Sequence, residues 1–96
     1  MPTATWNGAI IAQAADDEVE IVENNVYFPL SAVNKDYLQP SIHTSRCPWK
    51  GLASYYSVSV DGKVNENAAW YYPEPLEAAK QIKDRVAFWR GVDVQR

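Results

Sequence analysis

Apolar and polar residues alternate with a period of two over much of the chain, and this pattern predicts β-strands. In the segment that ends at Val60, Tyr56 and Val58 share one side with it, whereas Ser57 and Ser59 fall on the other side. This is the pattern of a strand with one buried face.

Two dipeptides between extended runs predict hairpin turns. Asp61-Gly62 is the stronger signal, because both residue types tolerate the positive φ that a two-residue hairpin turn requires. We expect the return strand to resume through residues 68–72 and to end at Pro73. The pair Asn24-Asn25 predicts a second turn, within a hairpin over residues 18–29.

The start of the chain predicts a strand, and two other segments predict short helices. Residues 6–14 are small or branched and suit one opening strand, with Gly8 marking a bulge. Residues 75–84 contain good helix formers behind a Pro and predict one short helix. Residues 31–38 predict a short helical turn with Ser31 as its N-cap.

Alternation returns after this helix, over residues 86–90, and Gly91 interrupts it before a last short strand. Strands with one intervening helix favour a mostly β protein, α+β at the margin. We expect a small antiparallel sheet system or an open barrel that forms a single domain over residues 1–96.

Composition supports this fold and excludes other classes. The 96 residues include four Trp, six Tyr and two Phe, and these large rings supply much of the core. One Cys excludes a disulfide scaffold, and no apolar run approaches the roughly 18 residues of a membrane span. No positively charged segment precedes an apolar stretch near the start, so we predict a cytoplasmic protein.

Charge is distributed unevenly along the chain, whose formal net charge is −3. Residues 1–34 hold five acidic side chains and no basic one, which is typical of a solvated hairpin and turn. The chain lacks the overall basic character of nucleic-acid-binding proteins, so we do not expect a nucleic-acid partner. A local basic spot at Arg46 and Lys50 would suffice for one small anion.

The segment 43–51 has the densest set of chemically active side chains. It holds the only His, the only Cys and two bases. Neighbouring cations lower the pKa of a thiol, so Cys47 between Arg46 and Lys50 is a candidate nucleophile with His43 as its base. The alternative is a buried Cys47 that packs as a small hydrophobic residue.

A ligand site is the other reading of this region. Hydroxyl, ammonium and guanidinium groups would hold an anionic part of a ligand, while nearby rings would contact a flat part. The predicted ligand-binding residues are Thr44, Arg46, Trp49, Lys50, Gly51, Trp70 and Tyr71. The alternatives are a Lys50 that lies along the surface, and rings that form a second packed face or a homodimer interface.

Metal and cofactor sites are not predicted. One Cys and one His cannot supply the four ligands of structural zinc, so zinc is not expected. The glycine-rich motifs that bind phosphate or dinucleotides are absent as well.

Two motifs give the chain a family resemblance. The block Cys47-Pro48-Trp49-Lys50-Gly51 and the block Ala69-Trp70-Tyr71-Tyr72-Pro73, with Pro75, occur in order about 20 residues apart. In these motifs, and over nearly its whole length, the chain resembles the bacterial domain-of-unknown-function family numbered 427. The matching positions are Cys47, Pro48, Lys50, Gly51, Trp70, Tyr71 and Pro75, with His43 and Thr44 in the polar stretch before the Cys.

The resemblance implies a compact β-rich, tent-like domain. Members of the family are sometimes labelled nucleotidyltransferase-like, but this chain lacks the Gly-Ser and paired-Asp signature that holds magnesium in ordinary nucleotidyltransferases. Three hypotheses for the function follow. The first is a module that binds an unidentified small anionic or flat molecule. The second is an enzyme, Cys-dependent or nucleotidyltransferase-like, and the third is a structural protein that pairs two copies.

Overall fold

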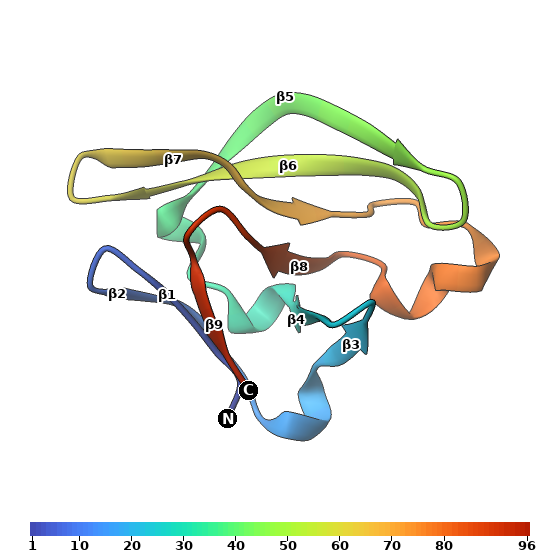
Figure 1. Ribbon diagram of the computed structural model, residues 1–96, viewed down its shortest axis with the longest axis horizontal. Helices are drawn as coiled ribbons and strands as arrows, with labels where there is room; N and C mark the ends of the chain where they lie inside the picture. Colours follow the sequence, from blue (N-terminus) through green and yellow to red (C-terminus); the bar gives the residue numbers. More distant parts are fainter.

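Two antiparallel sheets make up the computed structural model, which describes residues 1–96 (Figure 1). The smaller sheet has the strand order β2-β1-β9, and the larger has the order β3-β4-β8-β7-β6-β5. The strands are β1 (Thr3–Trp6), β2 (Ala9–Gln13), β3 (Glu20–Val22), β4 (Asn25–Pro29), β5 (Leu38–Cys47), β6 (Gly51–Val60), β7 (Lys63–Tyr71), β8 (Arg85–Phe88) and β9 (Asp93–Gln95). The predicted antiparallel sheet system is confirmed, and the sheets do not close into a barrel.

The hairpin between β6 and β7 turns where the sequence predicts it. Val60 pairs with Lys63, and Asp61 and Gly62 have φ values of 50° and 78°. The return strand is continuous, with a register shift near Asn67, whose φ is also positive. A local bulge of this kind bends the strand without ending it.

The hairpin between β3 and β4 is present, but its turn lies one residue earlier than predicted. Val22 pairs with Asn25, so the turn residues are Glu23 and Asn24, with φ values of 52° and 67°. Both make contacts with distant parts of the chain: Glu23 with Lys50, and Asn24 with Arg96. These tertiary contacts outweigh the local preference for Asn at both turn positions.

The prediction of one opening strand over residues 6–14 is wrong. Trp6 pairs with Ala9, and Asn7 and Gly8 form the turn of a β1–β2 hairpin with φ values of 49° and 79°. Asn-Gly is a strong signal for a two-residue turn. Small apolar residues follow this turn as well as precede it, so in the sequence the two short strands look like one longer strand.

The predicted helical segments adopt 3₁₀ geometry. The helix expected over 75–84 is η4 (Glu77–Ile82), which buries Ala79 and Ile82. Non-helical φ and ψ values at Ala79 show that the backbone kinks there instead of forming an α-helix. No helix in the structure is long and apolar enough to cross a membrane.

The turn predicted over 31–38 divides in two, η2 (Leu30–Ala32) and η3 (Lys35–Tyr37). Ser31 lies inside η2 and does not cap it, so that prediction is wrong. Asn34 caps η3 instead, because its side chain accepts a hydrogen bond from the backbone N–H of Asp36 at 3.1 Å. A further 3₁₀ helix, η1 (Asp16–Glu18), replaces the simple turn between β2 and β3.

The buried side chains of the large sheet belong to two hydrophobic clusters, one on each face of the sheet. The larger cluster includes Ile11 of the small sheet and Phe28 and Val58 of the large sheet, so it joins the sheets. The smaller cluster lies on the other face and includes Tyr27 and Ile82. Alternation along β4 and β8 thus buries neighbouring residues in different clusters.

The aromatic pairs of the sequence are divided in the same way. Tyr56 and Tyr71 pack on the larger cluster, and their rings stack with centroids 4.7 Å apart. Tyr55, Trp70 and Tyr72 lie with the smaller cluster. The prediction that Tyr56, Val58 and Val60 share a face is confirmed, and the other rings remain available to form a site.

Candidate functional site

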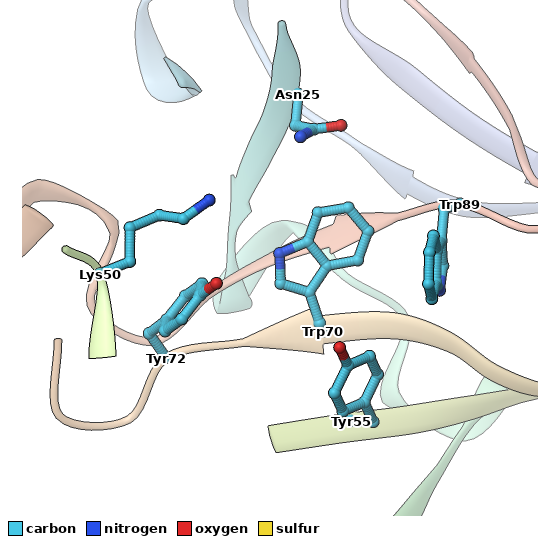
Figure 2. A pocket seen from close by; sticks show the side chains of 6 residues that line it. All are labelled: Asn25, Lys50, Tyr55, Trp70, Tyr72 and Trp89. Carbon is cyan, nitrogen blue, oxygen red and sulfur yellow. The ribbon is translucent and has the colours of Figure 1, made fainter. Parts of the chain in front are cut away.

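A pocket of about 330 Å³ lies on the face of the large sheet that carries the smaller cluster (Figure 2). Its walls come from β4, the turn between β5 and β6, β6, β7 and the segment that follows β8. The lining residues are Asn25, Lys50, Tyr55, Trp70, Tyr72 and Trp89.

Two tryptophans form the aromatic wall of this pocket. Trp70 and Trp89 meet edge to face, with ring centroids 5.7 Å apart and an interplanar angle of 77°. The Trp70 indole N–H donates to the Tyr27 hydroxyl at 3.1 Å, and the Trp89 indole N–H donates to the Asn67 carbonyl oxygen at 2.6 Å. Since a hydrogen bond holds each indole, both rings have a fixed orientation in the wall.

Lys50 enters the pocket from the turn between β5 and β6, and Gly51 makes this position possible. Gly51 has a φ of 109°, which L side chains rarely adopt. A Cβ there would lie 3.4 Å from the Glu74 carbonyl oxygen and 3.4 Å from the Leu76 backbone nitrogen. The Leu76 N–H donates to the Lys50 carbonyl oxygen at 2.9 Å, so the turn packs directly on the segment before η4.

The Lys50 side chain is buried and carries its own counter-ion. Only 8% of it is exposed, and its ammonium forms an ion pair with Glu23, whose side chain is 51% exposed. The ammonium also lies 5.5 Å from the centre of the Trp49 ring and 5.6 Å from that of Tyr72. Ion pairing and cation–π contacts offset the cost of removing the ammonium from water.

These contacts shift the pKa values of the neighbouring groups. The Lys50 hydrogen bond, with the Lys50 charge, lowers the pKa of Glu23. Burial acts to lower the pKa of Lys50, but the Glu23 hydrogen bond and the phenol groups of Tyr27 and Tyr72 raise it above its usual value. Burial raises the pKa of Tyr72, and the positive charge of Lys50 offsets part of this increase. Near neutral pH the ion pair is charged and the Tyr72 hydroxyl is protonated.

The pocket presents polar groups that the protein does not satisfy internally. No protein hydrogen bond engages the Tyr72 hydroxyl or the Asn25 amide, and no buried side-chain polar atom lacks a partner. Both groups are therefore accessible from the pocket, toward which they point (Figure 2). An ammonium has three donors, so Lys50 keeps donors beyond the one that Glu23 accepts.

Of the residues predicted to bind a ligand, Lys50 and Trp70 line the pocket. Trp49 and Gly51 flank Lys50 without lining it. Tyr71 lies on the opposite face of β7, where it stacks on Tyr56.

Thr44 and Arg46 are exposed on β5, and alternation places them on the side of the strand opposite Ser45. Ser45 is the neighbour that faces the site, because its hydroxyl lies 2.7 Å from the Tyr55 hydroxyl.

The candidate nucleophile and its base are not brought together. Three residues of β5 lie between His43 and Cys47, which places their Cα atoms roughly 13 Å apart along the strand. Cys47 is half-buried and packs on the smaller cluster. The His43 ring instead contacts the ring of Tyr55, with centroids 4.6 Å apart.

Sequence reasoning missed Asn25, Tyr55, Tyr72 and Trp89 among the lining residues. Alternation could have supplied two of them, since Tyr72 shares a face with Trp70, and β6 places Tyr55 opposite Trp70 in the sheet. No local signal identifies Asn25, nor Glu23 as the partner of Lys50. Both depend on the hairpin of β3 and β4 folding over this end of the sheet.

The fold and the pocket define a small two-sheet antiparallel β domain with an aromatic pocket beside a paired lysine. The chain belongs to the family described as domain of unknown function DUF427, whose model, named NTP_transf_9, matches residues 3–96. The resemblance seen in the sequence is thereby confirmed. A search of the curated proteins finds no match. The structure contains no group of three or more His, Cys, Asp or Glu side chains that could hold a metal ion.

Proposed function

We propose that this protein binds a small molecule that has a flat ring and a hydrogen-bond acceptor at its edge. One observation carries the proposal: the fixed indoles of Trp70 and Trp89 share a pocket with the Lys50 ammonium. Ligand sites are typically apolar and aromatic with a few well-placed polar groups, and this pocket has that composition.

The aromatic wall supports a flat ligand. The two indoles are close to perpendicular, so a ring that lies against one of them meets the edge of the other. The volume of about 330 Å³ is at the lower end for small-molecule sites, which fits a ligand with one or two rings.

The polar groups support an acceptor on that ring. Lys50 supplies N–H donors, and the Tyr72 hydroxyl is a second donor. The Asn25 amide both donates and accepts, so it can pair with either kind of group on the ligand. Together these side chains would orient a ring that the indoles hold by contact alone.

Binding of a small molecule is better supported than Cys-dependent catalysis. A Cys–His pair works as a nucleophile and base only within hydrogen-bond reach. The extended strand separates Cys47 from His43, and Cys47 lies outside the pocket lining.

Titration with nicotinamide tests the proposal, with cyclohexanecarboxamide, an uncharged carboxamide on a saturated six-membered ring, as the non-planar analogue. We expect protein-detected NMR to give a dissociation constant in the millimolar range for nicotinamide and at least fivefold weaker binding for the analogue. Equal affinities would contradict the requirement for a flat ring.

A matched pair of variants locates the binding. Trp89 lines the pocket, whereas Trp6 packs at the larger cluster and lies outside the lining. Trp89→Leu should weaken nicotinamide binding at least fivefold, whereas Trp6→Leu should leave it within twofold. Equal losses in the two variants would place the ligand elsewhere.

A further inference from the structure

The charge of Lys50 is compensated inside the protein, and this limits the ligands that the pocket can favour. Glu23 forms an ion pair with the Lys50 ammonium, yet Glu23 itself does not line the pocket. A ligand therefore meets the N–H groups of a cation that is already paired with a carboxylate.

No other charged side chain lines the pocket. Two exposed cations lie around it: Arg90 stacks on Trp89 at 4.5 Å from its ring centre, and Arg96 donates to Asn24, between Glu23 and Asn25. Water and salt screen the charges of both arginines. At the Lys50 ammonium itself, the charge of Glu23 balances that of Lys50.

A carboxylate ligand would gain the attraction of Lys50 but would also meet the repulsion of Glu23 and lose its own hydration. A neutral carbonyl loses far less hydration on entering a partly buried site. It still accepts a hydrogen bond from Lys50 or Tyr72. The balance favours the neutral acceptor.

We infer that the pocket selects a neutral ring that bears a carbonyl or amide, and that Glu23 sets this preference by neutralising Lys50. This inference rests on the proposed function and names the class of ligand within it. It replaces the anionic ligand of the sequence-based hypothesis with an uncharged one.

The position of Glu23 supports a role beyond the turn itself. Its φ of 52° lies in the left-handed region, where Gly, Asn and Asp are preferred over Glu. A carboxylate with a longer side chain occupies this position and reaches Lys50.

Nicotinamide and nicotinate provide the test, because they share a ring and differ in charge near pH 7. Both are titrated into the wild type, Glu23→Gln and Glu20→Gln. Glu23→Gln keeps an oxygen that can accept from Lys50 but removes the negative charge. Glu20→Gln removes the same charge from the same hairpin, and Glu20 forms no ion pair with Lys50.

The wild type should prefer nicotinamide, and Glu23→Gln should change the affinity ratio toward nicotinate at least tenfold. Glu20→Gln should keep the wild-type ratio within twofold. Glu23→Asn is a second uncharged variant whose residue type suits the left-handed turn, and it should change the ratio in the same direction.

Unchanged ratios in both Glu23 variants would overturn the inference while leaving the proposed function in place. A wild type that already prefers nicotinate tenfold would also overturn it. If no variant binds either molecule, the proposed function fails together with the inference.

Discussion

Trp70 packs on the smaller cluster and also lines the pocket. The variant Trp70→Phe tests how much the hydrogen bond and ring contacts of Trp70 stabilise the protein. The indole N–H donates to the hydroxyl of Tyr27, a residue with 0% exposure. The Trp70 ring also meets those of Tyr27 and Trp89 edge to face. Phe preserves an aromatic ring at this position but removes the hydrogen-bond donor.

The expected loss of stability follows from these contacts. Leaving a buried polar group without its partner costs about 1–3 kcal/mol. Each aromatic pair contributes about 0.5–1.5 kcal/mol, part of which the smaller ring loses. We therefore expect Trp70→Phe to lower the free energy of unfolding by about 2–4 kcal/mol. For a chain of this length, each kcal/mol lowers Tm by roughly 4–8 °C.

Urea denaturation followed by tryptophan fluorescence measures this change, with Trp6→Phe as the matched control. Trp6 packs at the edge of the larger cluster and, unlike Trp70, makes no hydrogen bond to Tyr27. Trp6→Phe should cost about 1 kcal/mol or less, since it removes only half-buried surface. Equal losses at the two positions would refute the role assigned to the Tyr27 hydrogen bond. A double-mutant cycle with Tyr27→Phe should give a coupling energy of about 1 kcal/mol.

Three further predictions concern Lys50 and its surroundings. Gly51→Ala should destabilise the protein more than Gly91→Ala in urea denaturation. Both glycines have positive φ, which costs an alanine about 1–2 kcal/mol, but only a Cβ at Gly51 would meet backbone atoms. Equal losses would contradict the close packing of this turn. Because the pKa of Glu23 is lowered by folding, its stabilising effect is present above the usual value of 4.5 and is lost as the pH falls through the folded-state pKa. The stability difference between the wild type and Glu23→Gln should thus shrink in acid, and a constant difference from pH 7 down to pH 2 would argue against the ion pair. Cys47→Ser should leave nicotinamide affinity within twofold by NMR titration, since Cys47 lies outside the pocket lining, and a tenfold loss would bring the thiol back into the site.

Local pattern was sufficient for much of the sheet. Alternation assigned Tyr56, Val58 and Val60 to one face, and Asp61-Gly62 located a turn, because both signals depend on residues next to each other. The signal for the Asn7-Gly8 turn was equally local, but it was interpreted as a bulge within one strand.

The β3–β4 turn was not predictable in the same way. The preference for Asn favours residues 24 and 25, whereas the contact of Glu23 with Lys50 links positions 27 residues apart. Such a contact enters the free energy only once the chain has folded, so local turn preferences do not contain it.

The site was predictable only in part, for the same physical reason. Lys50 and Trp70 stand out by composition and motif, and both line the pocket. Trp89 reaches them because β8 pairs with β7, with Ala87 opposite Trp70. Tyr71 was assigned to the site from its motif, although alternation along β7 directs it to the other face. The structural protein that pairs two copies, the third hypothesis from the sequence, stays a hypothesis.

The indole N–H signals of the four tryptophans offer the most direct test of the central claim that the aromatic pocket binds a flat ligand. In a ¹H–¹⁵N NMR titration with nicotinamide, the Trp70 and Trp89 signals should shift together along one saturable curve. The Trp6 signal should stay in place, since Trp6 packs at the larger cluster. The claim is contradicted if the Trp70 and Trp89 signals do not shift, or if the Trp6 signal shifts as far as they do.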